Sequence, residues 1–182
     1  MPFVPMTEYE TASEEVRREY DDQIRKHGRI TNMKRTLLQN VPSFKAYMEW
    51  YTLYDELQPV LGDRALSILS YAISSGNDCL ICGSFFKKIL EDGGDDPDDL
   101  KMDETEELLH TLGTCISLDP HNVPDYVYEG LKARFPDDVI VTIVAFAGLM
   151  YATNLFNTVM KVDLDEVLYD HRLITKEEKD RA

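Results

Sequence analysis

Two cysteines near the middle of the chain have a spacing suited to redox chemistry. Cys79 and Cys82 lie three residues apart in the run SSGNDCLICGSFF, and residues with this spacing share one face of a helix. Residues 76–78 (Gly-Asn-Asp) interrupt the helical pattern directly before them, so we expect Cys79 in the first turn of a new helix. There the unpaired backbone N–H groups and the helix dipole favour an anion, which lowers the pKa of a thiol and makes it a better nucleophile.

Core packing and metal binding are also compatible with this pair of cysteines. Cys79 and Cys82 form an apolar stripe with Phe86 at helical spacing, and cysteine is among the most often buried residue types, so ordinary core packing accounts for the pair equally well. A zinc site would need His110 and Cys115 as further ligands, but these two residues are five apart and share a helix face poorly. We therefore expect neither a metal nor a cofactor.

Composition excludes several classes of function. The chain has 34 acidic and 19 basic residues among 182, a formal net charge of −15, which argues against binding nucleic acid or an anionic membrane surface. Three cysteines are too few for a disulfide scaffold, and their odd number suits a reducing compartment. The first residues lack the basic and apolar regions of a signal peptide, so we expect a cytoplasmic protein.

The pattern along the chain predicts a single all-α domain over residues 1–182. Ser13 and Gly28 are signals for the start and end of the first helix, Asp103 with Glu106 is a capping box, and Pro59 is expected to end a helix that Ser43 caps. The acidic stretch 91–100 is interpreted as a solvated loop, and 171–182 as a charged tail. The predicted helices cover residues 13–26, 33–39, 43–57, 63–75, 78–91, 103–118, 124–135 and 137–160, with a short segment at 163–169.

The last long helix is unusually apolar. Its apolar run, 139–152, is shorter than the ~20 residues that span a bilayer, so we expect a buried helix and no membrane association. A second copy of the chain would help to bury so much apolar surface, which favours a homo-oligomer. Asn154 and Asn157 share one face of this helix, so they either bond to another helix or line a pocket.

Three segments resemble the alkylhydroperoxidase D-like and carboxymuconolactone decarboxylase family. The run ISSGNDCLICGSFF is similar to the core motif of that family, in which a helix ends in S-x-x-N-x-C-x-x-C. The upstream segment GRITNMKRTLLQNVPSFKAYMEWY and the downstream segment DPHNVPDYVYEGLKARFPDDVIVTIVAFAGLMYATNLFN also resemble it, so the similarity covers residues 10–170. The resemblance implies an all-α fold that assembles into homo-oligomers.

The resemblance also implies a reaction. In redox-active members the two cysteines reduce a small hydroperoxide or the disulfide of a partner protein, passing through a sulfenic acid and a disulfide. By position, Cys82 would react with the peroxide and Cys79 would resolve the sulfenic acid. The helix-dipole argument instead favours Cys79 as the thiol of lower pKa, and the order stays open.

The chain departs from the family at both proton-relay positions. Redox-active members have a His where this chain has Phe86, and a Glu where it has Ser67. General-base assistance contributes typically 10²–10⁴-fold, so its loss predicts a slow peroxidase, and an apolar ring beside Cys82 should raise the pKa of that thiol. The candidate supporting residues are Asn77, Asp78, Tyr71 and His110.

Ordinary structural roles also suit these candidates. Asp78 would cap a helix, Tyr71 would be a core aromatic, and His110 would be a half-exposed helix residue.

The decarboxylase branch of the family generally lacks the cysteine pair and acts on a lactone carboxylate, and such an anionic substrate suits an acidic protein poorly. A local basic pocket would be needed, although a basic stripe is usually a solvated helix face; its residues would be Arg29, Lys34, Arg35 and Lys45.

Two hypotheses about function follow. In the first, the protein is a dithiol oxidoreductase, a weak hydroperoxide or disulfide reductase with an antioxidant role, in which Cys79 and Cys82 form a redox-active disulfide. In the second, it is a non-catalytic member of the same family that serves as an oligomeric scaffold or binds a small apolar ligand.

Overall fold

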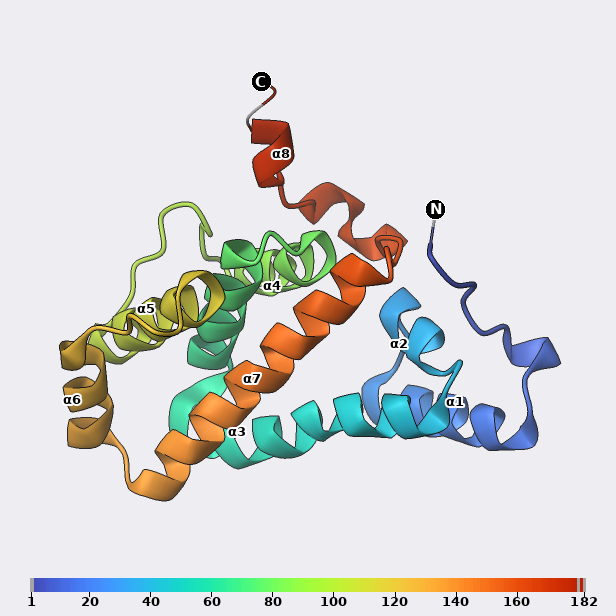
Figure 1. The fold of residues 1–182 in the computed structure, drawn as a ribbon, viewed down its shortest axis with the longest axis horizontal. Helices are drawn as coiled ribbons and strands as arrows, with labels where there is room; N and C mark the ends of the chain where they lie inside the picture. The colour runs from blue at the N-terminus through green and yellow to red at the C-terminus, as the bar shows by residue number, and fades with distance from the viewer. Residues whose placement is uncertain (1, 180, 182) are drawn as a thin grey trace.

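The computed structural model describes residues 2–179 and 181, so residues 180 and 182 of the predicted tail lie outside it. The described part is helical and contains no strand, which confirms the predicted all-α fold class. The helices, in chain order (Figure 1), are η1 (Tyr9–Thr11), α1 (Glu14–His27), α2 (Asn32–Leu37), α3 (Val41–Gly76), α4 (Leu80–Asp92), α5 (Glu104–Leu118), α6 (Asp125–Arg134), α7 (Asp137–Val159), η2 (Glu166–His171) and α8 (Lys176–Lys179), where η marks a 3-10 helix.

Helix α3 is the centre of the fold, and α4, α5 and α7 all pack against it. Two of the sequence predictions for this region were wrong. The helix begins at Val41 under an Asn40 cap instead of at Ser43, and Pro59 lies inside it. The break comes at Gly62, whose φ of 77° and ψ of 161° lie outside the helical range. Proline removes one backbone hydrogen bond, whereas a positive φ requires a new chain direction, so the glycine sets the kink.

The kink divides α3 into two halves with different neighbours. In Figure 1 the first half runs along the lower edge, below α2 and overlapping α1, and the chain turns upward after the kink. Every residue of the second half from Ala65 to Ser74 is buried. The first half instead presents a row of aromatic side chains, and Trp50 stacks on Tyr54 and lies against Phe146 of α7.

The junction of α3 and α4 is a tight turn. The backbone N–H of Cys79 donates to the carbonyl of Ser74 at 3.0 Å, and that of Asp78 donates to Ser75 at 3.1 Å, with φ of 55° at Asp78. This is the Schellman arrangement that ends a helix. The expectation that Asp78 caps α4 was therefore wrong, because Cys79 holds the N-cap position.

The carboxyl-terminal segment lies across the same junction. The Asp78 carboxylate accepts the backbone N–H of Lys176 at 2.9 Å, and the Ser84 hydroxyl accepts that of Leu173 at 2.9 Å. A Cβ added at Gly83 would come within 2.5 Å of the Leu173 side chain. The absence of a side chain at Gly83 thus lets this segment pack directly on α4.

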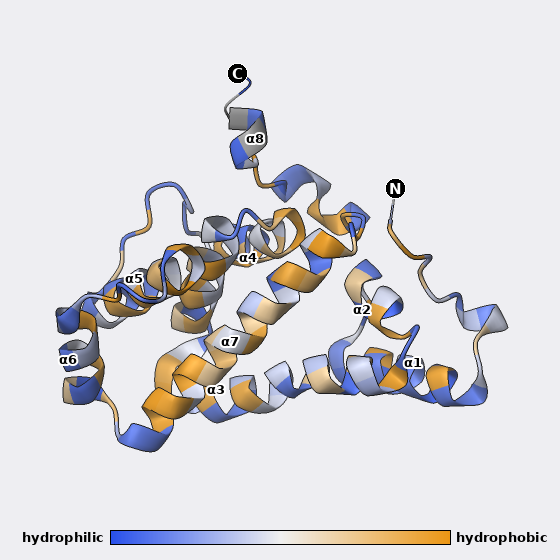
Figure 2. Cartoon of the chain, viewed as in Figure 1, coloured by the Kyte–Doolittle hydropathy of each residue, from blue (hydrophilic) through white to orange (hydrophobic). Residues whose placement is uncertain are grey.

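Helix α7 has one buried face and one exposed face, so the prediction of a buried helix was wrong for half of its surface. By length and composition alone its 23 residues would suffice to cross a membrane, and 28% of its most apolar window is buried. Its inner face packs in the core through Ile143, Phe146 and Ala147. Figure 2 shows that apolar residues continue along most of the visible length of the helix.

The acidic loop after α4 is less free than the sequence indicated. Most of its residues are exposed, as expected for a solvated loop. Asp95, however, accepts two hydrogen bonds from the Arg64 guanidinium, both at 2.9 Å. Arg64 also pairs with Glu106, the residue that completes the predicted capping box with Asp103. The loop is thereby fastened to both α3 and α5.

The contact between α3 and α5 generates a stability prediction. A Cβ at Gly113 would lie 2.8 Å from the backbone carbonyl oxygen of Leu69, which cannot rotate away. We expect Gly113→Ala to lower the free energy of unfolding by about 1–3 kcal/mol, measured by urea denaturation. In Gly130→Ala the new Cβ would meet the flexible end of the Leu108 side chain at 2.9 Å. This control should therefore lower the free energy of unfolding by clearly less. Equal losses would contradict the close-approach argument.

Candidate functional site

The two thiols meet at the start of α4. Both are free and buried, with 1% of Cys79 and 5% of Cys82 exposed. The hydrogen bond from the Cys82 thiol is the main cause that lowers the pKa of Cys79, and the backbone N–H groups of Cys82 and Ile81 and the Thr158 hydroxyl act in the same direction. These contacts outweigh burial and favour ionisation at Cys79; the largest of them comes from the Cys82 thiol, and the backbone N–H groups of the helix start add to it.

Cys82 has the opposite environment. Its hydrogen bond to Cys79 and its burial raise the pKa of Cys82 well above the ordinary value. The side-chain amide of Asn157 donates to the Cys82 sulfur at 3.1 Å and partly opposes this effect. Asn157 comes from α7, so the sulfur lies between two helices that are far apart in the sequence.

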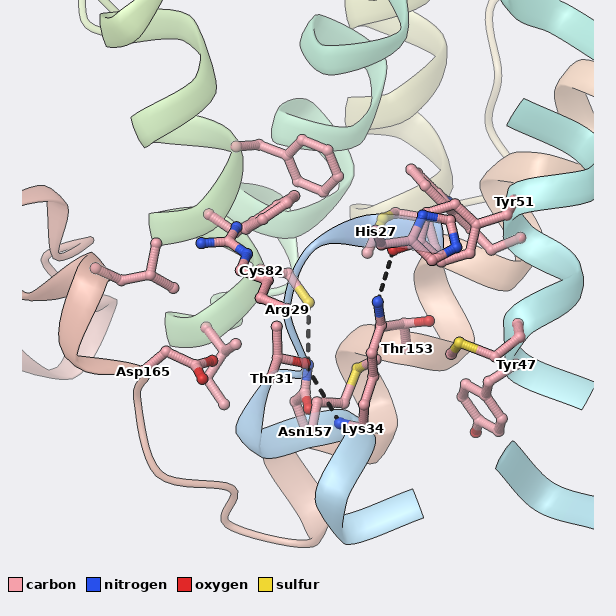
Figure 3. A pocket seen from close by; sticks show the side chains of 18 residues that line it. His27, Arg29, Thr31, Lys34, Tyr47, Tyr51, Cys82, Thr153, Asn157 and Asp165 are labelled. Atoms are coloured by element: carbon pink, nitrogen blue, oxygen red, sulfur yellow. Dashed lines mark hydrogen bonds between the residues drawn. The ribbon is translucent and has the colours of Figure 1, made fainter. Parts of the chain in front are cut away.

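A cavity of ≈ 330 Å³ opens beside this sulfur. Of the two cysteines, Cys82 is the one that lines it (Figure 3). Its walls come from the end of α1, from α2, from the first half of α3, from α4 and α7, and from the segment at Asp165–Leu168. Apolar lining comes from side chains such as Phe85, Trp50 and Met150, so a bound molecule would contact both hydrocarbon and the thiol.

A group of titratable side chains lies on another wall of the cavity. The amine of Lys34 donates to the Tyr51 hydroxyl at 2.7 Å, and the His27 ring stacks on Tyr51 with centroids 3.8 Å apart. Burial, together with the positive charge of Arg29, lowers the pKa of Lys34 to about 8. Burial also lowers the pKa of His27. Figure 3 shows Lys34 extending toward Tyr51.

Two solved structures have a similar arrangement of helices. A crystal structure described as alkylhydroperoxidase D core, an uncharacterized peroxidase-related protein from Ralstonia eutropha JMP134, matches with a TM-score of 0.72 and 17% identity, over 92% of this chain and 94% of that one. An uncharacterized peroxidase-related protein from Silicibacter sp. TM1040 matches with a TM-score of 0.69 and 16% identity, over 91% of each chain.

The chain has the alkylhydroperoxidase D core fold. No protein-family model matches the sequence, and no curated protein matches it. The likeness at 16–17% identity concerns the fold, and it agrees with the architecture that the resemblance around the cysteine pair implied.

Within this alkylhydroperoxidase D core fold, the relay positions hold no base. Phe86 is buried and lines the cavity. The Ser67 hydroxyl donates to the backbone carbonyl of Asp63 at 2.7 Å. Among the described residues the side chains that interact with the Cys82 thiol are those of Cys79 and Asn157, so no described carboxylate, imidazole or phenol is hydrogen-bonded to it.

The four candidate supporting residues lie elsewhere. Asp78 binds the carboxyl-terminal segment, and Tyr71 is buried in the core, where burial raises its pKa. Asn77 ends α3 and has a buried amide nitrogen without a partner. His110 is half-buried on α5, and burial lowers its pKa. In the described part of the chain none of the four forms a hydrogen bond with either thiol or lines the cavity.

Two further sequence interpretations can be compared with the structure. The described residues include no group of three or more His, Cys, Asp or Glu placed to hold a metal, so His110 and Cys115 do not complete a zinc site with the pair. Asn154 accepts the Ser74 hydroxyl at 3.3 Å across helices, while Asn157 both bonds across helices and lines the cavity. Both alternatives considered for the asparagines therefore occur: Asn154 bonds across helices, and Asn157 does both.

Sequence reasoning missed much of the cavity. Lys34 belongs to the stripe expected to be a solvated basic face, but it is buried, with 6% exposed, and Arg29 lines the cavity beside it. Arg35 and Lys45 do pair with surface carboxylates. The sequence held one usable signal: at helical spacing, Lys34 falls on the same face as Leu37 and Leu38, which are core residues.

The coupling of the thiols predicts how substitutions change their titration. We expect Cys82→Ala to raise the pKa of Cys79, because the S–H donor that stabilises its thiolate is lost. Cys82→Ser keeps a hydroxyl donor at the same place and should leave the pKa of Cys79 lower than in the alanine variant. Thiolate absorbance in the ultraviolet as a function of pH, in a Cys115→Ser background, measures both. Identical titrations in the two variants would argue against the hydrogen bond between the thiols.

Proposed function

We propose that the protein is a cytoplasmic dithiol oxidoreductase of the alkylhydroperoxidase D-like family, which reduces hydroperoxides with Cys79 and Cys82. The observation that supports this most directly is that Cys82 lines a cavity while its thiol lies close to that of Cys79. The peroxidase-related descriptions of the two structural relatives agree with the proposal. A reducing compartment keeps both cysteines as thiols until an oxidant arrives.

The proposed reaction uses the two sulfurs in sequence. Cys79, the stronger acid, first releases its proton to solvent; its thiolate then takes up the proton of Cys82, and the Cys82 thiolate attacks the terminal oxygen of the hydroperoxide. The oxygen–oxygen bond breaks, and the alkoxide leaves as alcohol with one proton of the pair, while Cys82 becomes a sulfenic acid. The Cys79 thiolate then displaces hydroxide from that sulfur, and a proton from solvent, equal to the one that Cys79 released at the start, completes a water molecule.

The balance is one hydroperoxide and two thiols converted to one alcohol, one water and one disulfide. Two electrons move from sulfur to oxygen. A dithiol reductant, either a small molecule or a partner protein, must then reduce the disulfide by exchange for the cycle to repeat. The interaction of the two thiols orders the roles: Cys79 holds the charge, and Cys82 meets the substrate.

The absence of a general base at the relay positions, Phe86 and Ser67, lowers the expected rate of peroxide reduction. Because Cys82 has a raised pKa and its other side-chain partner, Asn157, cannot accept a proton, proton removal from Cys82 depends on Cys79. Activity should therefore fall below that of an enzyme with a general base, by as much as 10²–10⁴-fold.

The absence of a base also favours a second candidate function, which is ligand binding without turnover. The cavity is large enough for a small organic molecule, since such sites begin near 300 Å³. In this case the thiols would serve only as packed side chains.

Loss of thiols on oxidation separates the two functions. We expect cumene hydroperoxide to remove two thiols per chain in the wild type and in Cys115→Ser, with formation of one Cys79–Cys82 disulfide. Cys79→Ser should stop at a sulfenic acid that dimedone traps, because the resolving thiol is gone. Stopped-flow consumption of the peroxide gives the rates, and an unchanged rate in Cys82→Ser would overturn the peroxidase proposal.

We further propose that the protein self-associates through the exposed face of α7. Five of its residues follow one another at alternating spacings of three and four, which is the seam pattern of packed helices. These residues, which we call the α7 seam, are Val141, Val144, Gly148, Tyr151 and Leu155. Gly148, with open space where a Cβ would lie, would allow two α7 helices to approach closely at the centre.

The α7 seam predicts an oligomer that a single charge disrupts. We expect light scattering after gel filtration to give a mass above the 20.9 kDa of one chain. Leu155→Glu should shift the protein to that monomer mass, because it buries an unpaired carboxylate in the interface. Val60→Glu changes an equally exposed residue on α3 and should keep the oligomer. A monomeric wild type would contradict the proposal.

A further inference from the structure

Two cations face the same cavity without a salt bridge to a described carboxylate, although the charge of Asp165 acts on both from a longer distance. Neither Lys34 nor Arg29 forms an ion pair within the described residues, although Lys34 is buried. Lys34 bonds to the neutral hydroxyl of Tyr51, and the Arg29 guanidinium lies over the Phe85 ring, 5.6 Å from its centroid. A buried charge usually has a countercharge, and two like charges side by side repel each other. The arrangement therefore costs folding free energy that an anionic ligand would offset.

The charge of the cavity differs from that of the whole chain. Of the residues that line it, Asp165 is the one carboxylate, and its side chain accepts the backbone N–H of Asn32 at 2.9 Å. Two cations against one carboxylate leave a local excess of positive charge inside a protein of net charge −15. Such an excess attracts anions into a site shielded from solvent.

The rest of the lining is suited to hydrocarbon. Met48, Phe86 and Met150 contribute apolar surface. Two polar atoms of the lining residues are buried without partners, Nε1 of Trp50 and Oδ1 of Asn157. Buried polar groups in proteins are nearly always hydrogen-bonded, so these two atoms leave hydrogen-bonding capacity unused in the wall of the cavity.

A wider hollow adjoins the cavity and shares part of its wall. This hollow of ≈ 710 Å³ is lined by residues on α2 and around η2. It shares Arg29, Phe85 and Asp165 with the cavity, so these side chains stand between the two spaces. Arg29 therefore borders both spaces, whereas Lys34 lines only the cavity.

We propose that this cavity binds an amphipathic organic anion. Its carboxylate lies between Arg29 and Lys34, and its apolar body packs on Trp50 and Phe85. Binding needs no redox chemistry at the thiols. The further step, that the natural ligand is a carboxylate-bearing hydroperoxide with its oxygen–oxygen bond against Cys82, rests on the proposed function.

Trp50 is the chain's single tryptophan and lines the cavity, so its fluorescence reports occupancy. The probes are 4-phenylbutyrate and its neutral alcohol, 4-phenylbutanol, titrated into the reduced protein. We expect the carboxylate to bind at least about tenfold more tightly than the alcohol, the ratio that a hydrogen bond to a charged group provides. Lys34→Gln and Arg29→Gln should each remove most of this preference.

Controls separate the site from general electrostatics and from misfolding. Lys45→Gln removes an equal charge from a surface pair with Glu19 and should leave the preference intact. Arg29→Gln serves as the second variant if Lys34→Gln loses its helical circular dichroism. Equal affinity for both probes, no binding of either, or an equal effect of Lys45→Gln would overturn the proposal. Tight carboxylate binding by a protein that leaves hydroperoxides unreduced would count against the proposed function alone.

Discussion

The closeness of the two thiols depends on one backbone turn. At the end of α3 the chain adopts a left-handed residue, Asp78, and Cys79 then both closes α3 and opens α4. This double role brings the sulfur of Cys79 toward that of Cys82 and toward the free N–H groups of the new helix. The same turn directs Cys82 away from the helix start, toward Asn157 and the cavity. Cys79 is therefore the more acidic of the two thiols, whereas Cys82 is the one that lines the cavity.

The local parts of this site could be predicted from the sequence, whereas the assembled parts could not. The helix break before Cys79, the Ser13 cap and the Asp103 capping box each depend on residues a few positions apart, and the structure has all three. Pro59 was a poor guide because proline only weakens a helix, while Gly62 can adopt the conformation that redirects it.

The cavity depends on distant packing, and this is why sequence patterns do not reveal it. Its walls come from segments as far apart as α1 and η2, and no spacing rule connects them. Lys34 illustrates the difficulty: a lysine on a short helix is usually exposed, but here Tyr51 from α3 covers it. At the relay positions, Phe86 and Ser67 are both buried, so the core accommodates these replacements. The same burial contributes to the raised pKa of the Cys82 thiol.

The contact between Gly83 and Leu173 links the residue after the second cysteine to a segment 90 positions later. A methyl group at Gly83 would occupy the space of the leucine. In homologous chains, these two sites should consequently change together during evolution: a bulkier residue in the helix would accompany a smaller one in the tail, or a different path of the tail. Such covariation would show in which lineages the carboxyl-terminal segment packs on α4 as it does here.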